Sequence, residues 1–374
     1  MSNNTGMTYA STGVDYDAMD PFKKMAQNAA LCTSTNLDHF GDEMFQEFRP
    51  SRGESVFLIE TPDSFLAHVE EGLGTKNLVA DAMDFGDKCY YRQIAQDTVA
   101  MIVNDMVTLG ALPISVAMHL AVGDSSWFDY KKRSFALIDG WMKACNLARC
   151  VWGGGETPTL KDIIIPGTAV LSGSAIGIIK PKERRIGGIA MGEIRAGDSI
   201  VIIESSGIHA NGLTLARSIA DKLPNGYLTE LPDGRTYGET LLDPTHIYVG
   251  LIEDCLHVGV MIHYAVNITG HGWRKLMRAT QPFTYVIDSL PPRPPIFDFL
   301  QKHGPIDDRE AYGNFNMGAG FALFVDENEV DTVIGIANSL DIRAYDAGYI
   351  EEGERRVIIR PVDLEYSGAT LAVR

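Results

Sequence analysis

The chain has 374 residues, of which 45% are apolar and 22% are charged, and its formal net charge is −17. This length exceeds that of one ordinary core, so the sequence predicts two domains, with enough apolar material for both. The strong negative charge argues against nucleic acid or an anionic membrane as a partner.

The sequence also favours a cytoplasmic protein. It contains no run of eighteen apolar residues that could span a membrane, and its first nine residues lack the basic and apolar pattern of a signal sequence. Five cysteines occur without a Cys-x-x-Cys pair, and this odd number fits reduced thiols.

The first informative segment, residues 71–76, reads Glu-Gly-Leu-Gly-Thr-Lys. Glycines such as Gly74 let backbone N–H groups approach an anion closely, and Lys76 supplies a mobile positive charge. Thr75 adds a hydroxyl, and Glu71 adds a carboxylate that could bind a metal. The spacing is not that of a Walker A loop. An ordinary surface loop is the alternative interpretation.

A predicted amphipathic helix at 92–109 carries the next candidate residues. Its apolar residues recur at three- and four-residue intervals, and Gly110, followed by a proline three residues later, predicts its end. Asp105 follows Asn104, and Asp97 lies eight residues earlier, about 80° around the helix. Both carboxylates can therefore share one face and bind Mg²⁺. A solvated acidic face is the alternative.

Residues 151–157 read Val-Trp-Gly-Gly-Gly-Glu-Thr and are predicted to form a strand that ends in a glycine-rich turn. Gly154 and Gly155 lie in this turn, with the carboxylate of Glu156 at its tip. Strand ends are where α/β proteins place ligands. A flexible turn without a ligand is the alternative.

Residues 205–212 read Ser-Ser-Gly-Ile-His-Ala-Asn-Gly, between a predicted strand and a predicted helix. This arrangement is typical of an anion-binding helix start. Ser206 could simply cap the helix. His209 and Asn211 are less suited to capping and could meet a substrate. A similar glycine turn occurs at 269–272.

A domain boundary is predicted near residue 185, where a polar run at 180–185 is followed by closely spaced glycines. The predicted domains are 1–185 and 186–374, and the second half is typical of an α+β domain. Strands are expected at 114–122, 150–152 and 169–179 and near residues 199, 260, 283, 320 and 342. Helices are expected at 92–109 and 130–147 and near residues 213, 245, 273, 296 and 330.

Seven short motifs occur along the chain: Gly-Val-Asp-Tyr-Asp-Ala at 13–18, Gly-Thr-Lys at 74–76, Asp-x4-Gly-Ala-x-Pro at 105–113, Gly-Gly-Glu-Thr at 154–157, the 205–212 segment, Leu-Leu-Asp-Pro-Thr at 241–245, and Asn-Phe-Asn-Met-Gly at 314–318. In this order they resemble the motifs of phosphoribosylformylglycinamidine cyclo-ligases, also called aminoimidazole ribonucleotide synthetases. The resemblance covers nearly the whole chain.

The resemblance implies an α+β, two-domain, AIR-synthetase-like fold. Residues 1–185 would form an N-terminal, sheet- and barrel-forming domain for ATP binding and dimerisation. Residues 186–374 would form a C-terminal α/β sandwich on the substrate side. The resemblance also implies a homodimer that is formed through the N-terminal halves.

The implied activity is that of a ligase in purine biosynthesis. Mg²⁺ and ATP would phosphorylate the amide oxygen of formylglycinamidine ribonucleotide, and ring closure would give aminoimidazole ribonucleotide, ADP and phosphate. The implied catalytic residues are Lys76, His209 and Asn211, the implied metal ligands are Glu71, Asp105 and Glu156, and the implied nucleotide-binding residues are Gly74, Thr75, Lys76, Asp97, Asn104, Asp105, Gly154, Gly155 and Glu156.

The chain departs from the family pattern at several places around the substrate. The family usually has Asp and Val where Glu71 and Leu73 stand, and Gly where His271 stands. Its segment after Gly-Gly-Glu-Thr also differs from residues 158–166 here. Two alternatives therefore stay open. One is a paralogue with the same Mg-ATP site that activates another amide, thioacid or phosphate acceptor. The other is a non-catalytic binding or scaffold subunit.

Overall fold

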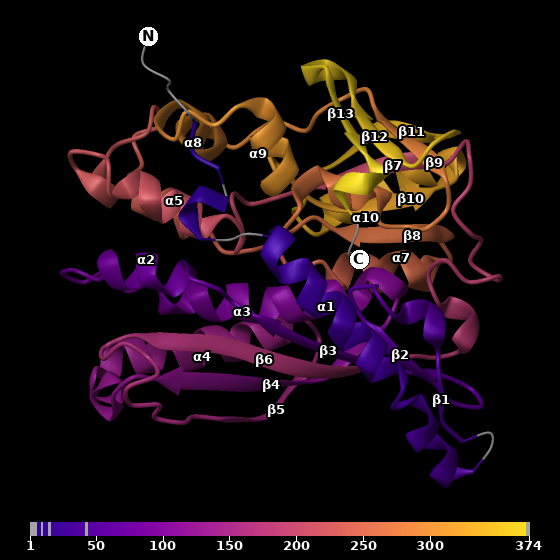
Figure 1. Cartoon of the computed structure of the whole chain (residues 1–374), viewed down its shortest axis with the longest axis horizontal. Helices are drawn as coiled ribbons and strands as arrows, with labels where there is room; N and C mark the ends of the chain where they lie inside the picture. The colour runs from indigo at the N-terminus through magenta and orange to yellow at the C-terminus, as the bar shows by residue number, and fades with distance from the viewer. Residues whose placement is uncertain (1–5, 9, 14–15, 42–43, 372–374) are drawn as a thin grey trace.

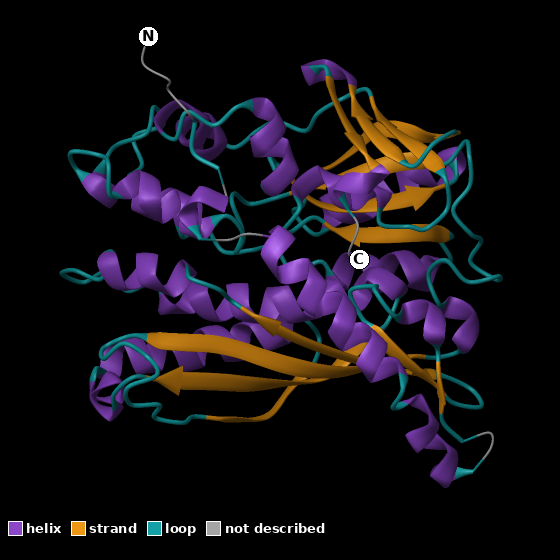
Figure 2. Cartoon of the chain, viewed as in Figure 1, coloured by secondary structure: helices purple, strands orange, loops and turns teal. Residues whose placement is uncertain are grey.

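The protein has two mixed β-sheets, one built from each half of the chain, in a two-domain α+β fold (Figure 1). This computed structural model describes residues 6–8, 10–13, 16–41 and 44–371. The first sheet has six strands in the order β1-β2-β3-β6-β4-β5, and the second has seven in the order β13-β12-β9-β11-β7-β10-β8. Helices lie between the two sheets and beside the second sheet (Figure 2).

The strands of the first sheet are β1 (Gln46–Glu47), β2 (Phe57–Glu60), β3 (Phe65–Gly72), β4 (Leu112–Val122), β5 (Val151–Glu156) and β6 (Ala169–Ile179). The strands of the second sheet are β7 (Ser199–Glu204), β8 (Ile262–Asn267), β9 (Phe283–Ile287), β10 (Ala319–Val325), β11 (Ala344–Glu352), β12 (Arg356–Ile359) and β13 (Leu364–Ser367). The helices are α1 (Tyr16–Leu31), α2 (Lys76–Ala82), α3 (Tyr91–Met106), α4 (Lys131–Leu147), α5 (Leu213–Ala220), α6 (Tyr237–Leu241), α7 (Val249–Val258), α8 (Pro295–His303), α9 (Asp308–Asn314) and α10 (Val330–Ser339).

Helix α3 lies between the two sheets. It packs on β3, β4 and β6 of the first sheet and also contacts β8 of the second sheet. Thirteen of its sixteen residues are buried, which leaves almost no solvent-facing side. A short 3₁₀ helix, η4 (Val107–Leu109), continues α3 and ends at Gly110 with φ +84. The predicted helix at 92–109 and its glycine stop are therefore confirmed.

The other predicted elements are largely confirmed, with three differences. The segment near residue 245 is not helical, and α7 begins only at Val249. The helix predicted near residue 273 is the 3₁₀ helix η8 (Gly272–Met277). The glycine-rich turn predicted at 151–157 is wrong, because its glycines lie within β5. There a Cβ on Gly155 would come within 2.2 Å of the Met118 carbonyl oxygen, so only glycine permits this close pairing with β4.

The first sheet has one covered face and one open face. In β3 the side chains alternate between buried and exposed up to Glu70, as expected for a half-buried strand. The covered face packs against α3. The open face, called the outer face below, carries the exposed apolar side chains Leu66, Val151, Val170 and Ile176. Across the described residues, no helix combines the length and apolar character needed to cross a membrane.

Candidate active site

A buried ion pair of the first half is hydrogen-bonded to the second half. The Lys76 ammonium, at the start of α2, lies 2.9 and 2.8 Å from the two carboxylate oxygens of Asp97 on α3. It also donates to the carbonyl oxygen of Asp243, at 2.7 Å. Both charged side chains are fully buried. The ammonium thus donates hydrogen bonds to Asp97 Oδ1 and to Asp243, whereas Asp97 Oδ2 has the ion contact but no hydrogen-bond partner among the described residues.

The segment that follows Asp243 completes this network. The backbone N–H and the hydroxyl of Thr245 both donate to Asp97, at 2.8 and 2.5 Å. About two helical turns further along α3, the carboxamide of Asn104 donates to the His246 carbonyl and accepts from the Tyr248 N–H, at 2.8 and 2.9 Å. Asp97 and Asn104 therefore fix residues 243–248 against α3. These hydrogen bonds explain why residues 243–248 do not begin a helix.

A second acidic group lies at the other end of α3. Asp105 accepts a hydrogen bond of 2.7 Å from the carboxamide of Asn267, at the end of β8. Glu71, at the end of β3, has the parity of the covered face and lies close enough to interact electrostatically with Asp105. The two carboxylates come from neighbouring elements of the first half and face the second half.

The pKa shifts around Glu71 and Asp105 indicate that their negative charge is only partly neutralised. Burial, followed by the negative charge of Asp105, raises the pKa of Glu71 to about 7, although Lys275 opposes the shift. Burial also lowers the pKa of Lys275 to about 8, while Asp105 and Glu71 act in the opposite direction. Two neighbouring carboxylates, the buried Asp105 and the partly exposed Glu71, are the ligand type that Mg²⁺ prefers. Glu71 and Asp105 therefore fit a divalent cation.

Lys275 is the residue of this site that the sequence did not single out. It lies on η8 and donates to the hydroxyl of Thr269. Residues three apart lie on one side of a 3₁₀ helix, so Lys275 and Arg278 both face the end of α3. Arg278 itself is bonded to the carbonyl of Gly53 and the hydroxyl of Ser55.

Glu156 lies on the opposite face of the first sheet. Glu156 pairs with His119, His119 pairs with Ser172, and Ser172 pairs with Gly72, so these residues form one row across the sheet. This row lies on the outer face. Glu156 is exposed and borders an outer-face cavity of about 540 Å³ that Glu70 and His119 also line. Three strand spacings separate β5 from β3, roughly 14 Å. The structure therefore does not bring Glu156 together with Asp105 or Lys76 within one chain, contrary to the expectation of one shared cavity.

The remaining nucleotide-binding candidates lie in two places, one next to Lys76 and one next to Glu156. Gly74 has φ +77 with open space around it, and Thr75 occupies the N-cap position of α2 without a side-chain capping hydrogen bond. Within the described part of the chain the buried hydroxyl of Thr75 has no hydrogen-bond partner. Gly154 and Gly155 belong to β5 and lie near Glu156. The two candidate glycine motifs are thus at separate strands of the first sheet.

His209 and Asn211 lie in the turn between β7 and α5. His209 is buried, has φ +58, and its Nε2 accepts from the Ser206 N–H at 3.2 Å. Burial lowers the pKa of His209 well below its usual value, so the ring is neutral. Asn211 accepts from the Gly270 N–H at 3.1 Å and reaches Met101 of α3. Both side chains thus hold the loop in place.

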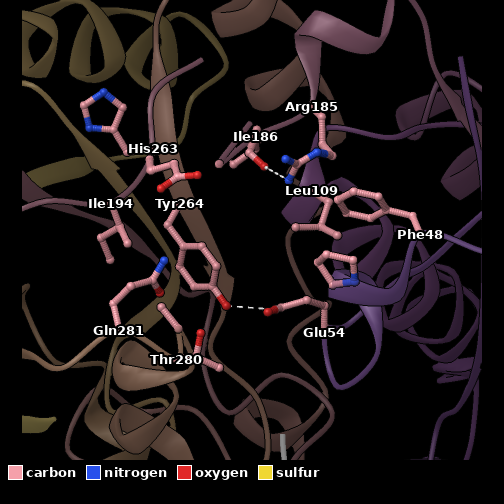
Figure 3. A pocket seen from close by; sticks show the side chains of 14 residues that line it. Phe48, Glu54, Leu109, Arg185, Ile186, Ile194, His263, Tyr264, Thr280 and Gln281 are labelled. Carbon is pink, nitrogen blue, oxygen red and sulfur yellow. Dashed lines mark hydrogen bonds between the residues drawn. The ribbon is translucent and has the colours of Figure 1, made fainter. Parts of the chain in front are cut away.

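Two further cavities lie beside these groups. One, of about 310 Å³, opens at the seam between the halves, where the Tyr264 hydroxyl donates to Glu54 at 2.8 Å (Figure 3). The other, of about 450 Å³, is bordered by Ser205 and Ser206 and by three arginines. Each arginine is already paired with an acid, in the pairs Arg235–Asp243, Arg293–Asp298 and Arg343–Glu204.

Both halves of the chain match one protein family. Residues 62–179 match the AIR synthase related protein, N-terminal domain, and residues 195–360 match the AIR synthase related protein, C-terminal domain. This protein, a two-domain α+β chain with an acidic pair between its halves, therefore belongs to the AIR synthase related family. The family resemblance and the fold class predicted from the sequence are confirmed.

Individual relatives agree with this membership. The chain is 33% identical to the phosphoribosylformylglycinamidine cyclo-ligase of Carboxydothermus hydrogenoformans, over 94% of this chain and 98% of that protein. Two solved structures share its fold. One is AaThiL complexed with AMPPCP and TMP, with a TM-score of 0.55 and 14% identity over 84% of this chain and 90% of that one. The other is the hydrogenase maturation protein HypE in complex with ATP, with a TM-score of 0.55 and 16% identity over 80% and 83%.

Replacing Lys76 with methionine is expected to destabilise the protein strongly. The substitution leaves the Asp97 carboxylate buried without its counter-ion, which costs about 3–5 kcal/mol of the free energy of unfolding. Urea denaturation measures this loss. Adding Asp97→Asn should recover part of it, because a neutral carboxamide replaces the buried charge. Lys88→Met, which breaks the exposed pair with Glu239, is the control and should change little.

The result also tests the role of Lys76. If Lys76→Met unfolds no more easily than the wild type but no longer binds nucleotide, its ammonium serves the phosphate, as the sequence motif suggested.

Glu71→Gln is expected to stabilise the metal-free protein at pH 8, with a smaller effect at pH 5. The folded protein holds the Glu71 proton up to about pH 7, whereas the unfolded chain releases it near pH 4.5. Stability therefore falls between these values as pH rises, and above pH 7 the ionised carboxylate costs on the order of 1–3 kcal/mol. Urea denaturation in the presence of a chelator measures this. Glu70→Gln, on the outer face, is the control, and an equal gain at both pH values would contradict the prediction.

Proposed function

We propose that this protein is a Mg-ATP-dependent cyclo-ligase of purine biosynthesis in the cytoplasm. It would convert formylglycinamidine ribonucleotide into aminoimidazole ribonucleotide, with release of ADP and phosphate. The observation that carries the proposal is the Glu71–Asp105 pair between the two halves of a chain that is 33% identical to a cyclo-ligase over both halves. A pair of close carboxylates facing a domain seam suits the binding of a metal-bound triphosphate.

The reaction needs the terminal phosphate of ATP to pass to the amide oxygen of the substrate. The amidine nitrogen then attacks the activated carbon, and phosphate leaves with that oxygen. Glu71 and Asp105 would hold Mg²⁺, which when bound supplies positive charge to the phosphate oxygens. Asn267 orients Asp105 by its hydrogen bond of 2.7 Å. The turn that contains His209 and Asn211 holds the substrate side of the seam in shape.

The acceptor could differ from formylglycinamidine ribonucleotide. AaThiL and HypE share the fold and bind ATP or its analogue, yet their names point to different substrates. The segment that departs from the family pattern exposes two apolar side chains here, Ile163 and Ile165, at 79% and 73%. These observations favour, as the second candidate, a paralogue that uses the same nucleotide site with another amide, thioacid or phosphate acceptor.

We also infer that the protein is a homodimer formed through the outer face of the first sheet. Four exposed apolar side chains, Leu66, Val151, Val170 and Ile176, lie on this face. Burying such a surface against a second copy is favourable in proportion to its apolar area. Glu156 lies on the same face, so dimer formation would place it beside the partner chain.

Asp105→Asn is expected to reduce ADP release from Mg-ATP and formylglycinamidine ribonucleotide by about 100-fold or more, because a metal ligand is lost. Folding should survive, because the asparagine oxygen can still accept from Asn267. A coupled assay for ADP and a thermal melt measure the two effects. Asp221→Asn, on the surface after α5, is the control. If the wild type binds nucleotide but releases no ADP with this substrate, the paralogue is favoured. If it binds no nucleotide, the scaffold interpretation is favoured.

Ile176→Asp is expected to convert the dimer into a monomer, because it places a charge in the middle of the apolar outer face. Sedimentation velocity at micromolar concentration measures the change. Leu228→Asp removes a similarly exposed apolar side chain from the 3₁₀ helix η7 (Gly226–Leu228) of the second half and should leave the assembly unchanged. A wild-type protein that sediments as a monomer would contradict the inferred dimer.

A further inference from the structure

The cation next to the acidic pair is not the lysine of the glycine-rich segment. The ammonium of Lys76 is fully buried, is ion-paired with Asp97, and donates hydrogen bonds to Asp97 and Asp243. Releasing it would leave the Asp97 carboxylate buried and unpaired, which is unfavourable. A phosphate that is bound at Glu71 and Asp105 must therefore find its positive partner elsewhere.

Lys275, unlike Lys76, lies next to the acidic pair of Glu71 and Asp105. It interacts electrostatically with both Asp105 and Glu71. Within the described part of the chain, the hydroxyl of Thr269 is its one hydrogen-bond acceptor, so two of its three donors have no partner. Its side chain is only half-buried, which leaves it accessible to a ligand.

The backbone of η8 holds Lys275 firmly in this position. Arg278, one 3₁₀ turn further on, bonds to Gly53 and Ser55 of the first half. Trp273, on the other side of η8, is fully buried and donates to the Asn316 carbonyl at 2.8 Å. The helix is thus anchored to both halves, and Lys275 extends from it toward the carboxylates.

The charges of the site also require such a group. Two carboxylates and a triphosphate are all negative, and one divalent cation neutralises only part of that charge. Lys275 comes from the second half, whereas both carboxylates come from the first half. A phosphate held by Lys275 beside Glu71 and Asp105 would therefore be contacted from both halves of the chain.

We propose that Lys275 is a further catalytic residue, whose ammonium donates a hydrogen bond to the terminal phosphate of the bound nucleotide. This rests on the proposed Mg-ATP site but not on the identity of the acceptor. Before nucleotide binds, the same ammonium serves as a counter-ion to Glu71 and Asp105. When nucleotide binds, the ammonium would exchange its interaction with these carboxylates for one with the phosphate, and Glu71 and Asp105 would then hold the metal.

The test compares nucleotide binding in the full-length protein by isothermal titration calorimetry. Lys275→Met is expected to weaken the binding of Mg-AMP-PNP by about 10- to 100-fold, the loss of one charge-assisted hydrogen bond, and that of Mg-ADP by less than about threefold. Lys275→Arg keeps the charge and should restore most of the affinity for Mg-AMP-PNP. Lys222→Met removes an exposed lysine and should change neither ligand.

Three results would overturn the proposal. The first is unchanged affinity of Lys275→Met for both nucleotides. The second is an equal loss for Mg-ADP and Mg-AMP-PNP, which would place the contact away from the terminal phosphate. The third is tighter binding of Mg²⁺ alone with no loss of Mg-AMP-PNP, which would leave Lys275 a counter-ion only. If Lys275→Met does not fold, Lys275→Gln is tested in the same way.

The outcome is separable from that of the proposed function. Neither nucleotide experiment uses formylglycinamidine ribonucleotide. A wild-type protein that binds Mg-AMP-PNP but does not turn over this ribonucleotide overturns the proposed acceptor and leaves the Lys275 test intact. A wild-type protein that binds neither nucleotide overturns both.

Discussion

The contact between Lys76 and Asp97 sets the geometry on which the rest of the molecule depends. Two fully buried charges are tolerated only when they are paired and hydrogen-bonded, and here Asp243 and Thr245 add hydrogen bonds to the pair, while Asp97 Oδ2 keeps only its ion contact with Lys76. Because Asp243 and Thr245 belong to the second half, the pair fixes how α2 and α3 meet that half. A hydrophobic contact would let the two halves shift relative to each other, whereas these directional hydrogen bonds form in only one relative position of the halves.

Helix α3 transmits that alignment to the acidic site. Asp105 follows Asp97 by eight residues, which is about 12 Å along the axis. Once Asp97 is fixed, Asp105 is directed at Asn267 and lies beside Glu71. The two aspartates are of one residue type on one helix, yet the first is enclosed by donors and the second has one hydrogen bond and a like-charged neighbour. Their partners, rather than their spacing, make the first structural and leave the second available for a ligand.

Local patterns in the sequence predicted what local physics determines. The three- and four-residue apolar spacing of α3 and the positive φ of Gly110 both follow from nearby residues, and both were predictable. The partner of Lys76 was not, because Asp97 and Asp243 lie 21 and 167 residues away. The face on which Glu156 lies depends on a register shift where β5 pairs with β4, and no periodicity in a glycine-rich segment reports it.

Lys275 illustrates the same limit in another form. An α-helix would set Lys275 and Arg278 about 60° apart, whereas the 3₁₀ geometry of η8 brings both side chains into line. A chain with a formal charge of −17 repels an anionic nucleotide at long range, so its few cations must act at short range. The arginines of the cavity beside Ser206 are each neutralised by an acid. Lys275 faces two carboxylates that a metal can take over, and it is therefore the cation whose charge becomes available when the nucleotide arrives.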